Sequence, residues 1–209
     1  MPTRDSRSPG ERGHLLARLV TELLAPWVIV LVLPLVVAGR ATAGFGSTLL
    51  WGMVVALTSS VLPMGVVVWG SRTGRWDGHH VRDRRGRLVP FTALIVLSLL
   101  GLALLIAGDA PEKLIALDIS MIISLFVTGT VTVFWKISMH TAVAAGAVTV
   151  LALLYGPALL WGALVTLAVA WSRVAVRDHT PAQATIGALT GAVVGGGSFA
   201  LLLGGNTAL

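Results

Sequence analysis

Long apolar runs alternate with short polar connections along this chain of 209 residues. Most runs approach the roughly 20 residues that a helix needs to cross the hydrocarbon core of a bilayer. The pattern therefore predicts an all-α, polytopic membrane bundle of six to seven transmembrane helices. In the seven-span form, the helices lie near residues 15–38, 46–70, 90–107, 114–135, 139–154, 157–171 and 181–204.

Proline and glycine divide these runs. Pro34 and Pro63 lie inside the first two predicted spans, where a proline ring is expected to kink the helix. The fifth and sixth spans are short, and the sequence Tyr155-Gly156-Pro157 between them is typical of a tight turn. These two spans are predicted to form a helical hairpin, with a re-entrant pair as the alternative.

The composition agrees with a membrane protein. The chain is 56% hydrophobic and 11% charged, whereas soluble domains carry about 25% charged residues. Its net charge of +6 and pI near 11.3 could indicate a nucleic-acid partner. In so apolar a chain, attraction to the anionic cytoplasmic leaflet is the better interpretation, and no nucleic-acid partner is expected. The absence of cysteine excludes disulfides and thiolate chemistry.

The positive charges predict an orientation. If the N-terminus is cytoplasmic, 13 of the 15 Lys and Arg residues fall on the cytoplasmic side of a seven-span chain, all except Arg40 and Lys113. All five histidines fall on that side too. The positive-inside rule therefore predicts a multi-pass protein of the cell membrane with a cytoplasmic N-terminus.

The N-terminal region divides into two parts. Residues 1–13 are rich in Arg, Ser, Pro and Gly and are predicted to form a disordered basic tail. Residues 14–209 are predicted to form a single transmembrane domain. A cleaved signal peptide ending near Ala41-Thr42-Ala43 is the alternative, but the apolar run is longer than a signal core and Glu22 interrupts its start. A retained first helix is the preferred interpretation.

Two polar clusters stand at the ends of predicted spans. Lys136 and His140 form the first, and Arg173 and His179 form the second. Lysine and arginine bind phosphate, and histidine can act as a nucleophile or general acid near neutral pH. Lys136 taken alone could be an interfacial lysine beside Trp135. Together the clusters predict phosphoryl chemistry on a lipid.

A helix start follows the second cluster. In Thr180-Pro181-Ala182-Gln183, threonine is the predicted N-cap, proline the first helical residue and glutamine the partner in a capping box. His179 therefore lies beside a positive helix terminus, where an anion is favoured.

Residues 136–191 resemble the type 2 phosphatidic acid phosphatase superfamily. Its third motif, S-R, five residues, H, three residues, D, is matched by Ser172, Arg173 and His179, with Gln183 in place of the final Asp. Its second motif ends in P-S-G-H, of which this chain keeps the serine and the histidine in Ile137-Ser138-Met139-His140.

The first motif of that superfamily, K, six residues, R-P, is poorly matched. Arg75 and Arg82 have its spacing, but Asp83 follows instead of proline. A second arginine run precedes Pro90 and consists of Arg84, Arg85 and Arg87. The resemblance is accordingly looser from 72 to 135.

The resemblance implies a role for each matched position. His179 would attack phosphorus to form a phosphohistidine, and His140 would protonate the leaving lipid oxygen. Arg173 would hold the non-bridging oxygens. Further phosphate-binding candidates are Lys136, Ser138, Ser172 and the arginines Arg75, Arg82, Arg84, Arg85 and Arg87. Such a site needs no metal and no cofactor.

Gln183 leaves the nucleophile without the carboxylate that the motif normally supplies. Asp178 and the intramembrane Asp118 are the candidate substitutes. The expected function is a metal-independent phosphatase acting on a lipid phosphate or diphosphate of polyprenyl or phosphatidyl type. The alternative is a non-catalytic membrane protein that binds or moves anionic lipid with the same cationic pocket.

Overall fold

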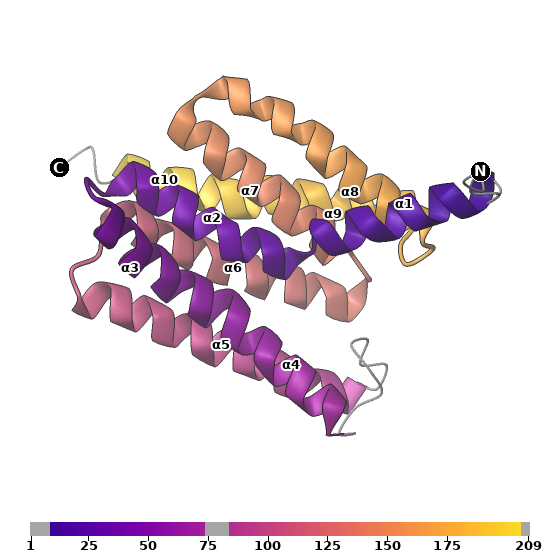
Figure 1. Ribbon diagram of the computed structural model, residues 1–209, viewed down its shortest axis with the longest axis horizontal. Helices are drawn as coiled ribbons and strands as arrows, with labels where there is room; N and C mark the ends of the chain where they lie inside the picture. Colours follow the sequence, from indigo (N-terminus) through magenta and orange to yellow (C-terminus); the bar gives the residue numbers. More distant parts are fainter. Residues whose placement is uncertain (1–8, 74–83, 206–209) are drawn as a thin grey trace, which may run out of the picture.

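The fold, seen in a computed structural model, consists of helices joined by short connections (Figure 1). The structure describes residues 9–73 and 84–205, and side chains over 11–73 and 91–204. Strands are absent from this part of the chain, so the all-α prediction is confirmed. The elements are α1 (Pro9–Leu23), α2 (Pro26–Ala41), α3 (Phe45–Ala56), the π-helix η1 (Leu57–Val61), α4 (Leu62–Arg72), α5 (Arg84–Ala107), α6 (Glu112–Phe134), α7 (Met139–Tyr155), the 3₁₀-helix η2 (Pro157–Gly162), α8 (Ala163–Ala175), α9 (Pro181–Thr190), the π-helix η3 (Gly191–Gly196) and α10 (Gly197–Gly205).

Fewer helices than expected meet the requirements of a membrane span. Within the described residues, four helical stretches are long and apolar enough: Phe45–Arg72, Glu112–Phe134, Pro157–Ala175 and Pro181–Gly204. The bent pair α1–α2 makes a fifth if it is one span. The predicted count of six to seven is therefore not reached. The two apolar stretches that fall short are α7 and Phe91–Ala107, the part of the 24-residue α5 whose side chains are described; both have 10–17 residues. Several spanning-length apolar helices remain, consistent with a membrane protein.

The helix irregularities differ from those expected at Pro34 and Pro63. The first segment bends by 44° between α1 and α2, and Pro34 lies inside the continuous α2. The bend comes just before Pro26, which occupies the first turn of α2 because that position requires no backbone N–H donor. In the second segment, the π-helix η1 precedes Pro63. The predicted tail also begins to fold earlier than expected, since α1 starts at Pro9.

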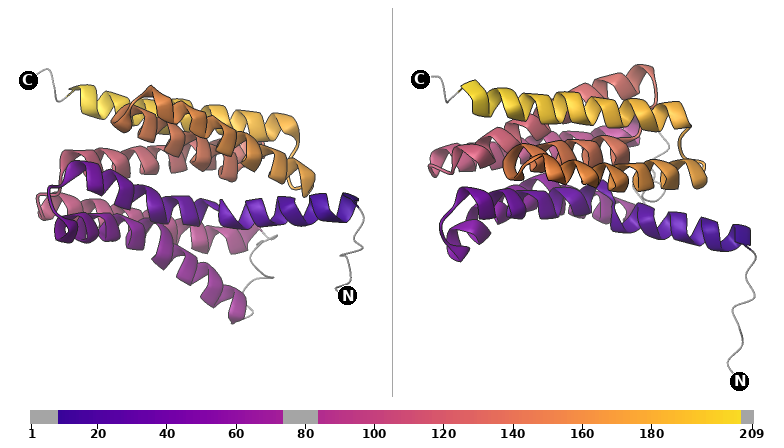
Figure 2. Two further views of the ribbon diagram at one scale, coloured as in Figure 1. Left: turned by 45° about the horizontal axis from the view of Figure 1, so that its top comes forward. Right: turned by 90° about the horizontal axis from the view of Figure 1, so that it is seen from above.

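Consecutive segments run in alternating directions along the bundle, and the two termini lie at opposite ends (Figure 1). The view from above shows α1–α2 and α9–α10 on opposite sides of the bundle, with α7 and α8 between them (Figure 2). In the same view α1 projects beyond its neighbours at the N-terminal end (Figure 2). The turn after Tyr155 returns the chain so that α8 packs along α7, as expected for a helical hairpin. Gly156 makes this turn with φ 108°, a conformation that favours glycine.

The packed core occupies one end of the bundle. It joins the C-terminal half of α2 to the beginning of α6 and the later part of α7, with Leu33, Val37, Leu114, Leu117 and Phe199 among its members. Large apolar side chains also cover the outside, among them Phe45, Phe134 and Leu201, each at least 78% exposed. An apolar outer surface suits a lipid surrounding better than water. The other end of the bundle is hollow and carries the polar clusters.

Close contact between α7 and the α9–η3 helix fixes that hollow end. A Cβ on Gly187 would lie 2.5 Å from the Ser138 carbonyl oxygen, and a Cβ on Gly191 would collide with the Ala142 carbonyl oxygen. The Thr141 hydroxyl donates to the Ala184 carbonyl oxygen at 2.8 Å, which ties the first turns of α7 and α9 together. Because His140 lies on α7 and His179 just precedes α9, this contact positions the two histidines relative to each other.

Candidate functional site

A cavity of about 1590 Å³ opens within the hollow end of the bundle. Its walls come from α1, α2, η1, α4, α5, α6, α7, the end of α8 and η3. Apolar side chains form much of the wall, among them Trp27, Val30, Phe91, Leu94, Leu125 and Val143. The volume exceeds the 300–1,000 Å³ or so of ordinary small-molecule pockets. A large ligand with a substantial apolar part therefore fits this space.

Both predicted clusters contribute to the lining of this one cavity. Lys136 and His140 come from the α6–α7 connection and the first turn of α7. Arg173, Asp178 and His179 come from the end of α8 and the α8–α9 connection. The sequence separates the clusters by more than 30 residues, and the fold places them around the same space. Lysine, arginine and two imidazoles thus face a cavity with apolar walls.

Arg173 is the most buried of the cationic groups, with 7% of its side chain exposed. Its Nη2 donates to Asp178 Oδ2 at 2.7 Å, forming an ion pair. Its Nε is also buried but has no hydrogen-bond partner. Lys136 approaches the same residue from the other connection, donating from Nζ to the Asp178 carbonyl oxygen at 2.7 Å. Asp178 is therefore the residue that links the two clusters.

The α8–α9 connection is folded back on the end of α8. The backbone N–H groups of Asp178 and His179 both donate to the Arg173 carbonyl oxygen, at 3.1 and 3.2 Å. Arg177 adopts φ 60° to make this reversal. The predicted capping box is present: Gln183 N donates to Thr180 Oγ1 at 3.3 Å, and Thr180 N donates to Gln183 Oε1 at 3.1 Å.

His179 is half-buried, and its Nδ1 is buried without a hydrogen-bond partner. Burial lowers the pKa of the imidazole, and the nearby positive charges of Lys136 and Arg173 lower it further. The Gln183 side chain and the Asp178 carboxylate oppose this decrease in pKa. Since the ordinary pKa is already about 6.5, the ring is neutral at pH 7 and keeps a lone pair. A neutral imidazole is the form that acts as a nucleophile.

No family model, curated protein or solved structure matches this chain.

The two motif serines have structural roles. Ser138 is buried and caps α7, accepting from Thr141 N at 3.4 Å. Ser172 is also buried, donates to the Val169 carbonyl oxygen at 2.8 Å and accepts from the Thr21 hydroxyl at 3.1 Å. Neither serine lines the cavity. In this structure Ser138 serves as a helix cap and Ser172 forms a bond between α8 and α1; their phosphate contacts stay predictions.

Asp118 lies away from the cluster. It is fully buried on α6 and accepts from the Ser59 hydroxyl at 3.2 Å. Sixteen positions separate it from the end of α6, which at 1.5 Å per residue is about 24 Å of helix. Asp118 therefore cannot support His179 in this structure.

Of the predicted arginines, Arg75 and Arg82 lie outside the described residues, and for Arg84, Arg85 and Arg87 only the backbone is described.

The sequence did not identify the contribution of α1 to the site. His14, Arg18, Thr21 and Glu22 recur at helical spacing and line the cavity from one face of α1. The opposite face carries exposed leucines. These four residues are separated by 4, 3 and 1 positions, a spacing that places them on one face of a helix. This pattern could have indicated their role, but it lies in a charge-rich segment next to the predicted tail.

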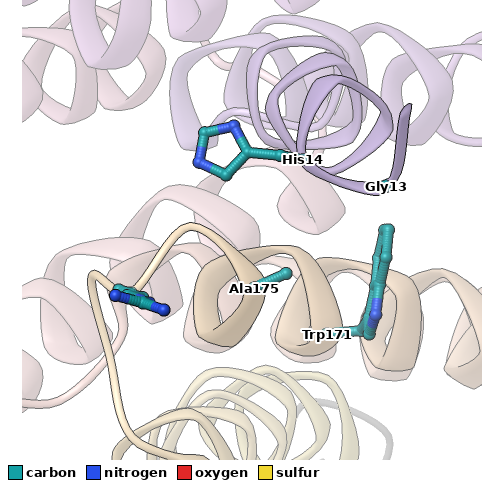
Figure 3. Close-up of a pocket in the computed structure, with 5 residues that line it drawn as sticks. Gly13, His14, Trp171 and Ala175 are labelled. Atoms are coloured by element: carbon teal, nitrogen blue, oxygen red, sulfur yellow. The ribbon is translucent and has the colours of Figure 1, made fainter. Parts of the chain in front are cut away.

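A smaller hollow of about 560 Å³ adjoins the site between α1 and α8. Gly13, His14, Trp171, Ala175 and Arg177 line it. Figure 3 shows His14 extending sideways from α1 above the end of α8, with Ala175 and Trp171 on the side of α8 that faces α1. His14 lines both spaces, so the hollow adjoins the edge of the larger cavity.

The arrangement suits an anionic head group with an apolar tail. Fixed cations bind phosphate oxygens without a metal, and the described residues contain no group of three or more His, Asp or Glu side chains suited to a metal ion. Two imidazoles are groups that can act as a nucleophile and as a proton donor. The apolar walls supply space for a lipid chain.

Proposed function

We propose that this protein binds a lipid phosphate or diphosphate in the cavity and hydrolyses it through a phosphohistidine intermediate. The observation that carries the proposal is the convergence of Lys136, His140, Arg173 and His179 on a large cavity with apolar walls. Phosphate groups are favoured beside fixed cations, and an apolar tail is favoured in the remaining space. Polyprenyl and phosphatidyl phosphates both have this amphiphilic character.

The proposed reaction has two steps. His179 Nε2 attacks phosphorus, the P–O bond to the lipid breaks, and His140 gives its proton to the leaving oxygen. Water then attacks phosphorus, its proton passes to His140, and the P–N bond breaks to release inorganic phosphate. Arg173 and Lys136 stabilise the charge on the non-bridging oxygens in both steps. The buried Nδ1 of His179 leaves Nε2 as the attacking atom.

Non-catalytic binding of the same lipids is the second candidate, and one observation favours it. Gln183 stands where the resembled motif has a carboxylate, and Nδ1 of His179 has no hydrogen-bond partner. A nucleophilic imidazole is normally oriented through the nitrogen that does not react. A site without that support would retain affinity for phosphate and lose rate.

Phosphate release from purified protein distinguishes the two candidates. Polyprenyl and phosphatidyl phosphates would be supplied in detergent with EDTA present, and binding of each lipid measured in parallel. The proposal predicts release by the wild type and none above about a thousandth of that rate by His179→Ala, because a lost nucleophile costs several orders of magnitude. Binding of lipid phosphate without release supports the second candidate. Failure to bind any of these lipids refutes both.

We also propose a cytoplasmic location for the hollow end of the bundle in the cell membrane. The described basic residues Arg72, Lys136, Arg173 and Arg177 all lie toward this end, and Arg40 and Lys113 toward the other. The chain has no cysteine, so Thr73→Cys and Ala43→Cys each introduce a single thiol, at opposite ends. An impermeant thiol reagent should label Cys at 43 in intact cells and Cys at 73 only in inverted vesicles. The reverse pattern refutes the orientation.

A further inference from the structure

We infer that Asp178 is displaced from Arg173 by the phosphate group and then becomes the carboxylate that positions His179. The inference rests on the proposed function, and it assigns Asp178 two successive roles. In the empty site its carboxylate is a stand-in for phosphate. In the occupied site it replaces the motif carboxylate that Gln183 lacks.

Of the Nε and Nη2 atoms of Arg173, only Nη2 has a hydrogen-bond partner. Its Nη2 and Nε form one edge of the planar fork, the edge that binds two oxygens of a phosphate side by side. Asp178 Oδ2 takes Nη2 at 2.7 Å, while Nε is buried and has no partner. A phosphate that binds both positions satisfies Nε and competes with Asp178 for Nη2. The greater charge of phosphate favours this exchange.

The displaced carboxylate has a second buried nitrogen to bind, Nδ1 of His179. His179 Nδ1 has no hydrogen-bond partner, although it belongs to the residue next to Asp178. Gln183 acts on the His179 ring through its side chain, but it carries no charge, and its Oε1 already accepts from Thr180 N at 3.1 Å in the capping box. Among the described residues, Asp178 is the carboxylate whose charge acts on the His179 ring.

The exchange requires movement of one side chain only. Three hydrogen bonds hold the backbone around it: Asp178 N and His179 N to the Arg173 carbonyl oxygen, and Lys136 Nζ to the Asp178 carbonyl oxygen. The Asp178 side chain is 40% exposed, so it has room to rotate about its own bonds. The loop can therefore keep its shape while the carboxylate changes partner.

The new contact assists both chemical steps. When His179 Nδ1–H donates to Asp178, the lone pair stays on Nε2, the atom that attacks phosphorus. The carboxylate also stabilises the positive charge that the ring acquires in the phosphohistidine. After water breaks the P–N bond and phosphate leaves, Asp178 returns to Arg173. No oxidant, reductant or metal is required.

The test compares Asp178→Asn with the wild type in two measurements. The first is affinity for inorganic phosphate and for octyl phosphate, measured calorimetrically with the full chain in detergent. Asp178→Asn removes the competing charge, so both ligands should bind more tightly, by up to about tenfold. The second is kcat on the best lipid phosphate of the panel, which should fall by at least about 100-fold.

Rescue separates positioning from loss of structure. Asp178→Asn combined with Gln183→Asp restores a carboxylate near His179 from the other side, and kcat should recover by about tenfold or more. Asp109→Asn makes the same chemical change in an exposed loop between α5 and α6, at the other end of the bundle, and should match the wild type in both measurements. Thermal unfolding of each variant reports whether it is folded.

Each outcome has a consequence. A wild-type rate in Asp178→Asn overturns the positioning role while leaving the proposed function intact. Weaker or unchanged phosphate binding in Asp178→Asn overturns the exchange. A wild type that releases no phosphate from any lipid instead refutes the hydrolysis itself, and the positioning role with it. In that case the affinity measurement still decides whether phosphate displaces Asp178.

Discussion

The contact between α7 and the α9–η3 helix offers a sharp test of how the site is held. Gly191 and Gly197 lie on the same apolar helical stretch, Pro181–Gly204. A Cβ at Gly191 would collide with the carbonyl oxygen of Ala142 on α7, whereas a Cβ at Gly197 meets nothing within 4 Å. Gly191→Ala and Gly197→Ala are therefore the same substitution in a crowded and in an open position.

The expected difference in stability follows from two opposing effects. Alanine in place of a helical glycine stabilises by up to about 1 kcal/mol, and this applies to both variants. Overpacking costs roughly 1–3 kcal/mol, and it applies at 191 alone, where the obstacle is backbone that cannot rotate away. The free energy of unfolding should thus be about 1–3 kcal/mol lower for Gly191→Ala than for Gly197→Ala. For a chain of this length that corresponds to roughly 2–12 °C in Tm.

The assay is thermal unfolding of both variants in the same detergent, followed by lipid phosphate binding. Gly191→Ala should also weaken binding, because separating α7 from α9 moves His140 away from His179. Gly197→Ala should bind like the wild type. If the two variants unfold at the same temperature, the close helix contact does not determine stability and the reasoning fails.

Three further predictions concern the site. His140→Ala should lose far more rate on an alkyl phosphate than on an activated aryl phosphate, since only the poor leaving group needs a proton; equal losses would show that His140 is structural. The rate of the wild type should fall with acid only below the ordinary histidine pKa, because burial and the charges of Lys136 and Arg173 lower the pKa of His179. Lys136→Met removes one of these charges and should move that acid limb to higher pH, and a shift to lower pH would contradict the assignment. Asp118→Asn should keep phosphate release within a few-fold of the wild type, and a loss of 100-fold or more would show that Asp118 acts at the site after all.

The sequence predicted features that depend on neighbouring residues. The apolar runs at 114–135 and 181–204 became Glu112–Phe134 and Pro181–Gly204. The capping box of Thr180 and Gln183 is confirmed because both partners lie within one helical turn. The shared location of Lys136, His140, Arg173 and His179 also agrees with the structure, since the spans bring their ends to the same side of the bundle.

Features that depend on distant packing could not be predicted from the sequence. Ser172 accepts a hydrogen bond from Thr21, 151 positions away, a contact between α8 and α1 that the motif did not indicate. The bend lies before Pro26 instead of at Pro34, because α1 turns to pack on α8. Asp118 belongs to the buried part of α6, and its depth along that helix separates it from His179. Each of these results depends on which helices become neighbours, and local sequence carries no such information.

The direction of the cavity has a consequence for how a lipid would reach it. Its lining follows α6 from Leu117 to Thr132, about 22 Å at 1.5 Å per residue, and the cationic groups stand at one end of that path. A bound lipid would therefore lie parallel to the helices, in the same orientation as a lipid within one leaflet. Its head group would be level with the head groups of the surrounding lipids. Entry then requires sideways travel between helices and no inversion across the bilayer. Under the proposed function, product lipid would return to the same leaflet by the same route, and released phosphate would leave on the aqueous side.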